Sequence, residues 1–133
     1  MENEALRAEP LSVPDLEQIR GGASASILSE LKRLLSISDL ELVAVVGIPR
    51  QTMLRRLKQG RLTRHESDRA ARLARVYNAA LEFFDYSHES AVRWLKHGNP
   101  ALAGETPLEH SDTEVGAEEV LTVLHRLAHG IPL

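Results

Sequence analysis

The chain contains no cysteine, which excludes disulfides, thiolate zinc sites and cysteine nucleophiles. This absence fits a reducing compartment, and we expect a cytoplasmic protein. Aromatic residues make up only 4% of the 133 residues, which argues against a platform that stacks on sugars or bases. No apolar run approaches the roughly 20 residues that span a bilayer, and the acidic start MENEALRAEP lacks the apolar core of a signal peptide. We therefore expect a protein of one or two small domains without a membrane partner.

The net charge of -3 is distributed unevenly along the chain. Residues 31–75 carry 11 Lys and Arg against 4 Asp and Glu, whereas residues 1–30 carry 2 against 6 and residues 76–133 carry 3 against 9. A basic middle between acidic ends predicts a surface that faces a polyanion. The alternative is a charged face that is merely solvated.

The hydrophobic pattern has helical spacing throughout, with no useful β-alternation and no repeat, so we predict an all-α fold. Residues 1–23 contain two prolines and the pair Gly21-Gly22, and we expect a flexible N-terminal arm with one helical turn near Asp15–Arg20. The first firm helix is predicted over Ser24–Leu35. Its apolar positions are Ile27, Leu28, Leu31, Leu34 and Leu35.

Two short helices follow, and their boundaries are marked by local signals. Ser38-Asp39-Leu40-Glu41 is a capping box that opens a helix over Asp39–Val46, which Gly47 stops. The next helix is predicted over Pro49–Gln59, because proline is tolerated at a first helical position. Residues 24–62 therefore match the spacing of a helix-turn-helix DNA-binding region. The alternative is a helical hairpin that only packs.

The second of these short helices is the candidate DNA-reading helix. We expect Ile48, Met53 and Leu57 to bury its inner face. Arginine can bond guanine in two places, and Gln and Thr can bond base edges or phosphates. The predicted DNA-binding residues on the outer face are Arg50, Gln51, Thr52, Arg55, Arg56 and Lys58, and Arg61 and Arg64 just beyond suit phosphates. One such unit makes few contacts, so a dimer that reads two half-sites is expected.

The C-terminal half is predicted to be helical as well. Thr63-Arg64-His65-Glu66 is a second capping box, and it opens a long helix to about Phe84. Residues 76–84 are apolar on nearly every side, so part of their burial is expected to come from a partner. Another helix is predicted over His88–Lys96, and a last one from Thr113 to a C-cap at Gly130. Its predicted apolar stripe is Val115, Val120, Leu121, Leu124 and Leu127.

A small core and a close helix contact are expected in this half. Trp94 and Leu95 on one helix, with Leu102 and Leu108 in the stretch that follows, form the predicted core. Gly116 inside the first turn of the last helix costs about 1 kcal/mol relative to alanine. A close backbone approach to another helix would explain why glycine is found there.

Chemistry-bearing patterns are scarce. We find no glycine-rich phosphate loop, no nucleophile elbow and no distinct acid–base pair, so we expect no enzyme and no cofactor. His125 and His129 are spaced like helical metal ligands, but no carboxylate or cysteine in the sequence completes a set. Histidines in a last helical turn also interact favourably with the helix dipole, and we expect no metal site.

The order of residues from the first capped helices to the end resembles the Xre/MbcA/ParS family of bacterial antitoxins. The most specific positions are Trp94-Leu95, Asn99-Pro100-Ala101-Leu102, Gly104, Thr106-Pro107-Leu108, Asp112-Thr113, Gly116 and Gly130. The resemblance covers about residues 24–133. It departs from the family pattern at His110-Ser111, where members often carry two apolar residues, so the packing of this loop is left open.

The resemblance implies a partner, a RES-domain toxin that consumes NAD. It implies that residues 63–133 form a toxin-binding and dimerisation domain, which occludes the active-site entrance of the toxin. It also implies that the helix-turn-helix region binds operator DNA and regulates its own operon, within a homodimer and a larger toxin–antitoxin complex. The alternative is a stand-alone helix-turn-helix transcriptional regulator that senses a ligand through its C-terminal half.

The sequence ends on a helix followed by a glycine and an apolar tip. Our hypothesis is that this segment enters the cleft of the toxin, with the histidines and the arginine facing its polar parts. The predicted toxin-binding residues are His125, Arg126, His129, Gly130, Ile131, Pro132 and Leu133. The alternative is a tip that packs on its own domain.

Overall fold

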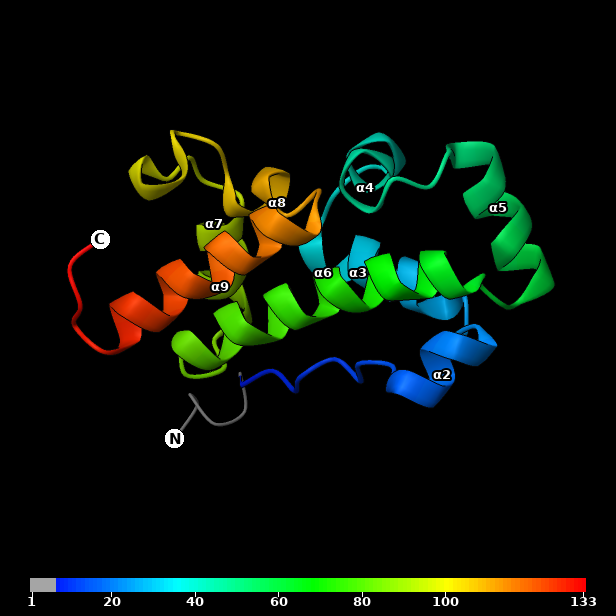
Figure 1. Ribbon diagram of the computed structural model, residues 1–133, viewed down its shortest axis with the longest axis horizontal. Helices are drawn as coiled ribbons and strands as arrows, with labels where there is room; N and C mark the ends of the chain where they lie inside the picture. Colours follow the sequence, from blue (N-terminus) through cyan, green and yellow to red (C-terminus); the bar gives the residue numbers. More distant parts are fainter. Residues whose placement is uncertain (1–6) are drawn as a thin grey trace. The chain divides into compact units, whose positions relative to one another are not determined.

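The computed structural model describes residues 7–133, which are helical and contain no strand; two isolated bridges pair Arg7 with Ser87 and Ser24 with Arg61. The elements are α2 (Leu16–Gly21), α3 (Ser26–Leu35), α4 (Asp39–Val46), α5 (Arg50–Gln59), α6 (Arg64–Phe83), α7 (His88–Leu95), the 3-10 turn η1 (Pro100–Leu102), α8 (Pro107–His110) and α9 (Glu114–Ala128) (Figure 1). The predicted all-α class is confirmed. No helix in the described part of the chain is both long and apolar enough to cross a membrane.

The chain divides into two compact units. The N-terminal unit comprises residues 12–74, and the C-terminal unit comprises residues 7–11 together with residues 75–133. This division falls inside α6, whereas we expected a boundary between residues 62 and 63. The side chain of Ser67 explains why the start of α6 belongs to the N-terminal unit. Its hydroxyl accepts the N–H of Ala23 at 2.8 Å and donates to the carbonyl of Thr63 at 2.7 Å.

The junctions of the N-terminal unit follow the local signals in the sequence. At the start of α4, Ser38 and Glu41 form the predicted capping box, each side chain accepting the other's backbone N–H. Gly47 ends α4 with φ 68°, in the left-handed region that favours glycine. Pro49 is the N-cap of α5, so the helix begins at Arg50, one position after the start that we expected. These local features place α4 and α5 as a helical pair joined by a short turn.

The inner face of α5 is smaller than we expected. Ile48 and Met53 are buried as predicted, but Leu57 is 36% exposed, so its predicted burial is wrong. Leu57 and Leu54 instead line an open groove of about 460 Å³ together with residues of α3 and α4. Because this groove is not filled by another side chain, Leu57 keeps part of its surface in solvent.

The segment before α3 makes more contacts than a flexible arm would. The predicted turn is present as α2, which Asp15 and Gln18 open with a capping box. Upstream, the side-chain amide of Asn78 donates to the carbonyl of Leu11 at 2.9 Å and accepts its N–H at 2.8 Å. Leu11 is also buried. From residue 7 onward the structure therefore differs from the expected arm, and residues 1–6 lie outside the described part of the chain.

The core of the C-terminal unit is formed by the second half of α6, by α7 and by α9. Its fully buried side chains include Val76, Tyr77, Leu81, Leu95 and Val120. Leu102 and Leu108 are buried as predicted. Trp94 is only half-buried and lies at the edge, with its ring 6.4 Å from that of Phe84.

The apolar stripe of α9 differs from the predicted one. Val120 and Leu124 are buried as expected, together with Ala117 and Val123, but Val115 is 69% exposed and Leu127 is 38% exposed. The reason is the orientation of Gly116: a Cβ at this position would overlap the carbonyl oxygen of His110. Since Gly116 and Ala117 face inward, the neighbouring Val115 turns toward solvent. The predicted close approach of another helix at Gly116 is confirmed.

Replacing Gly116 by alanine should destabilise the protein, because the new methyl group meets backbone atoms of His110 that cannot rotate away. We expect Gly116→Ala to lower the free energy of unfolding by about 2 kcal/mol, although alanine has the higher helix propensity. Urea denaturation followed by circular dichroism measures the change. Gly21→Ala is the matched control, since Gly21 is also helical and has open space around it; a loss no larger in Gly116→Ala than in Gly21→Ala would contradict the steric explanation.

Candidate nucleic-acid interface and C-terminal binding segment

The outer face of α5 carries most of the predicted DNA-binding residues. Arg50, Gln51, Arg55 and Lys58 are exposed, and Thr52 is half-buried. These side chains offer guanidinium, amide, hydroxyl and ammonium donors along one helix of ten residues. The helix therefore presents the groups that bond base edges and phosphates.

Asp39 forms an exposed ion pair with the arginine at the start of α5. Its carboxylate lies 3.2 Å from Nε of Arg50 and 2.8 Å from Nζ of Lys32. Hydrogen bonds from Lys32 and Arg50 hold the pKa of Asp39 below its usual value. The side chain of Arg50 remains 62% exposed, so this ion pair is weak and Arg50 is free to change partner.

Arg56 is half-buried and its Nε faces α6, whereas we predicted this side chain on the outer face of α5. Its Nε donates to Oε1 of Glu66 at 2.7 Å, and the two side chains are only 18% and 9% exposed. Burial alone raises the pKa of Glu66, but hydrogen bonds from Arg56 and from Thr63 outweigh it and hold the pKa below its usual value. The bond to Glu66 raises the pKa of Arg56. The Nε of Arg56 is directed toward α6 because a buried carboxylate lies there beside the last turn of α5, while its Nη1 donates to Oε1 of the exposed Gln59.

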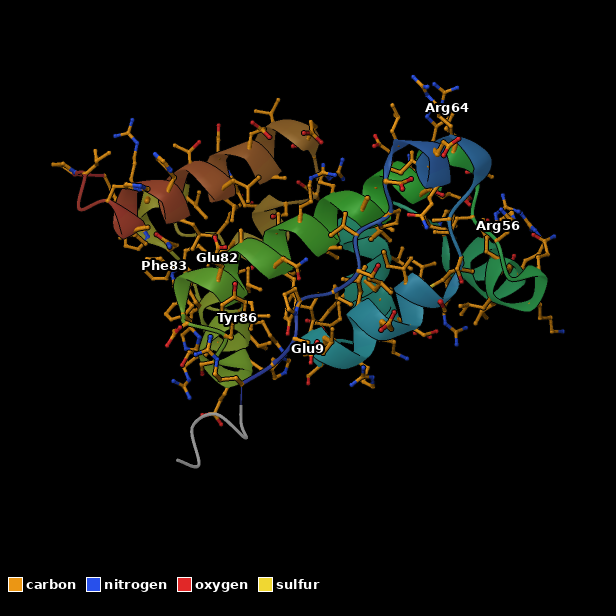
Figure 2. The ribbon with its side chains drawn as sticks, turned by 90° about the horizontal axis from the view of Figure 1, so that it is seen from below. Glu9, Arg56, Arg64, Glu82, Phe83 and Tyr86 are labelled. Atoms are coloured by element: carbon orange, nitrogen blue, oxygen red, sulfur yellow. The ribbon has the colours of Figure 1, made fainter. Side chains whose placement is uncertain are left out.

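The two arginines after α5 differ in their surroundings. Arg61 donates to the carbonyls of Gly22 at 2.9 Å and Gly21 at 3.3 Å, so it holds the connection between α2 and α3. Arg64 is exposed and its side chain extends away from α6 (Figure 2). Of these two, Arg64 is the better placed to reach a phosphate.

The segment after α9 is held in a defined turn. Gly130 has φ 65°, its N–H bonds the carbonyl of Leu127, and the N–H of Ile131 bonds the carbonyl of Arg126 at 2.9 Å. This pair of bonds is the Schellman arrangement that ends many helices. Gly130 is therefore the left-handed residue just past the cap, and His129 is the cap itself.

The structure brings the seven predicted toxin-binding residues together, and all of them are exposed. The rings of His125 and His129 lie 4.2 Å apart, and Nη1 of Arg126 donates to the carbonyl of Pro132 at 3.1 Å. Leu133, 63% exposed, lies at a groove that also includes Leu102 and Val123, so the segment turns back beside α9 (Figure 1). Within residues 7–133, no group of three His, Asp or Glu side chains is placed to hold a metal ion.

A groove between the second half of α6 and the second half of α9 was not predicted from the sequence. It has a volume of about 510 Å³, and its lining includes Glu82 and Phe83 at the end of α6, which Figure 2 labels, together with His125 on α9 and its C-cap His129. The apolar pattern of residues 76–84 was the signal that could have located it. The groove places apolar surface next to the exposed histidines.

His110 joins two acidic side chains in the C-terminal unit. Its Nδ1 lies 2.6 Å from Oε1 of Glu105, and its Nε2 lies 2.6 Å from Oε1 of Glu119 on α9. The hydrogen bonds to Glu119 and Glu105 raise the pKa of His110 above its usual value. Ser111 beside it is buried and donates to the carbonyl of Pro107. The polar pair His110-Ser111 therefore packs without the apolar residues that are common in the resembling family.

Both halves of the chain match sequence models of known domains. Residues 15–75 match an antitoxin Xre-like helix-turn-helix domain, and residues 79–130 match the antitoxin Xre/MbcA/ParS C-terminal toxin-binding domain. The chain is 32% identical over 117 residues to an antitoxin Xre of Yersinia enterocolitica, an alignment that covers 87% of this chain and 79% of the relative. It is 30% identical over 111 residues to an antitoxin Xre of Photorhabdus laumondii, covering 83% of this chain and 75% of the relative.

The contribution of His110 to stability should depend on pH. Because its pKa is raised in the folded state, the folded protein binds the proton more tightly than the unfolded chain does. The stabilisation is therefore fully present below the unfolded value of 6.5 and is lost as pH rises through the folded pKa. We expect the difference in unfolding free energy between the wild type and His110→Gln to be largest below pH 6.5 and to shrink as the pH rises through the folded pKa. Urea titrations at several pH values measure it, and a difference that stays constant would contradict the ion pairing.

Proposed function

Because this chain belongs to the Xre family of antitoxins, with a helix-turn-helix domain and a toxin-binding domain, we propose that it neutralises a RES-domain toxin that consumes NAD. The antitoxin acts by covering the active-site entrance of the toxin and carries out no reaction itself. It also represses its own operon by binding operator DNA as a homodimer. The support for a RES-domain partner is the residue order of the C-terminal half, which resembles antitoxins of that kind.

The observation that carries the neutralisation proposal is the exposed cluster on residues 125–133. It combines two imidazoles and a guanidinium at the end of α9 with the apolar side chains of Ile131 and Leu133, which follow the turn that Gly130 fixes. Binding energy in protein interfaces comes from a few anchors of this mixed kind. Because the turn is already ordered by hydrogen bonds to α9, the segment loses less conformational entropy when a partner receives it.

The observation that supports the DNA-binding proposal is the exposed polar face of α5. After the inward turn of Arg56, five of the six predicted residues remain there: Arg50, Gln51, Thr52, Arg55 and Lys58. A single helix of this size makes few base contacts, so specific repression requires two copies of the chain on two half-sites.

Removing residues 130–133 should weaken neutralisation while leaving the fold intact, because these residues are exposed and follow the last helix. We expect the concentration of antitoxin that halves NAD consumption by the co-purified RES-domain toxin to be about tenfold higher for the truncated protein than for the full-length protein. Leu40→Ser is the matched control, since Leu40 is the most exposed large apolar side chain of the N-terminal unit. Equal inhibition by truncated and full-length protein, with equal melting temperatures, would rule out the blocking segment.

Operator binding should weaken with salt in proportion to the phosphates that the protein contacts. For a cation that contacts a phosphate, replacement reduces the slope of log affinity against log salt concentration by about 0.9. We expect this reduction in Arg55→Met and in Lys58→Met, measured by fluorescence anisotropy with the promoter fragment of the operon. Arg93→Met serves as control, because Arg93 is an exposed arginine of the other unit. If all three variants kept the wild-type slope, α5 would not be the helix that contacts DNA.

A further inference from the structure

The orientation of α5 depends on few apolar contacts. Met53 is the one buried residue among the ten of this helix. The helix begins directly after the turn at Gly47–Pro49 and ends at Gly60, where φ is 87°. Short connections of this kind fix where a helix starts and ends, but the tilt of the helix is set by side-chain packing. Met53 alone provides little packing.

The ion pair of Arg56 and Glu66 supplies a second attachment at the other end of α5. Arg56 lies in the last turn of α5, and its Nε donates to Oε1 of Glu66 at 2.7 Å. The same oxygen accepts the N–H of Thr63 at 2.9 Å, while the hydroxyl of Thr63 accepts the N–H of Glu66. The carboxylate is therefore fixed in the capping box of α6, so the arginine that it holds is fixed as well.

We propose that Arg56 and Glu66 are a positioning pair that sets the angle at which α5 enters DNA, and that Arg56 does not contact DNA. The proposal rests on the operator binding proposed above. The half-buried guanidinium of Arg56 is held by a buried carboxylate. Exchanging this partner for a phosphate would leave the charge of Glu66 buried and unpaired, which is costly. Arg50 differs in this respect, because its partner Asp39 keeps Lys32 as a second cation.

Replacing Asp39 provides a matched control, because its expected effect on DNA affinity is opposite to that of replacing Glu66. Asp39 and Glu66 each hold an arginine of α5, at 3.2 Å and 2.7 Å. Asp39→Asn and Glu66→Gln both remove one negative charge near the face that approaches a polyanion, and Coulomb attraction alone would strengthen DNA binding in both. If Arg56 positions α5, Glu66→Gln weakens binding instead, since the helix loses its orientation.

The experiment measures the affinity of the full chain for the promoter fragment across a range of salt concentrations. We expect Glu66→Gln and Arg56→Met each to bind about tenfold more weakly, with the wild-type salt slope, whereas Asp39→Asn binds as tightly as the wild type or more tightly. Tighter binding by Glu66→Gln would overturn the proposal, because it would mean that the lost negative charge matters and the orientation of α5 does not. A slope lowered by about 0.9 in Arg56→Met would also overturn it, because it would mean that Arg56 contacts a phosphate.

A second variant keeps the test decisive if removing one partner unfolds the protein. The double replacement Arg56→Met with Glu66→Leu leaves no buried charge unpaired, and such replacements are often tolerated. We expect the double variant to fold and to retain the wild-type salt slope, whereas a lowered slope would contradict the positioning role. Failure of the wild type itself to bind the promoter fragment would instead count against the proposed operator binding.

Discussion

The arrangement of α5 and α6 in the N-terminal unit depends most on the hydrogen bonds that the carboxylate of Glu66 accepts from Arg56 and Thr63. A carboxylate that is 9% exposed is costly unless hydrogen bonds and an opposite charge surround it. Here the N–H of Thr63 and the guanidinium of Arg56 both meet one of its oxygens. One group thus closes the first turn of α6 and ties the last turn of α5 to it. The exposed face of α5 has a defined direction because its buried side is held in this way.

In the C-terminal unit, a close backbone contact at Gly116 and the hydrogen bonds of the His110 side chain occur at the same place. Gly116 allows α9 to approach the backbone of α8 at His110, and the side chain of His110 then spans Glu105 and Glu119. This contact fixes the start of α9. The far end of α9 and the turn at Gly130 carry exposed imidazole, guanidinium and apolar groups. An antitoxin of the Xre family can use such an arrangement to present a preformed segment to its toxin.

The sequence predicted those features whose causes lie within a few neighbouring residues. The capping boxes at Ser38 and Thr63, the turn at Gly47 and the tight glycine at Gly116 were all found where expected. Each depends on residues no more than four positions apart or on the cost of a glycine in a helix. The helix class and the family followed from these local signals and from the order of residues in the C-terminal half.

The features that the sequence did not predict depend on partners distant along the chain. The side chain of Asn78 forms hydrogen bonds with the backbone of Leu11, 67 positions away, and the hydrophobic pattern of the sequence does not predict this pair. Arg56 was assigned to the outer face because its position on α5 is compatible with both directions, and only the buried Glu66 decides between them. The spacing of Val115 matched the predicted apolar stripe of α9, but Gly116 faces the core, so Val115 faces solvent. Spacing along one helix does not contain this information.

The central claim is that separate surfaces of one chain bind a toxin and operator DNA. Hydrogen–deuterium exchange of the full chain, alone and with each partner, tests this most directly, because amide protection reports the covered segment. The account predicts that the toxin slows exchange in α9 and residues 129–133 but not in α5, and that DNA slows it in α5 and at the start of α6. Protection of α5 by the toxin, with α9 unchanged, would contradict it.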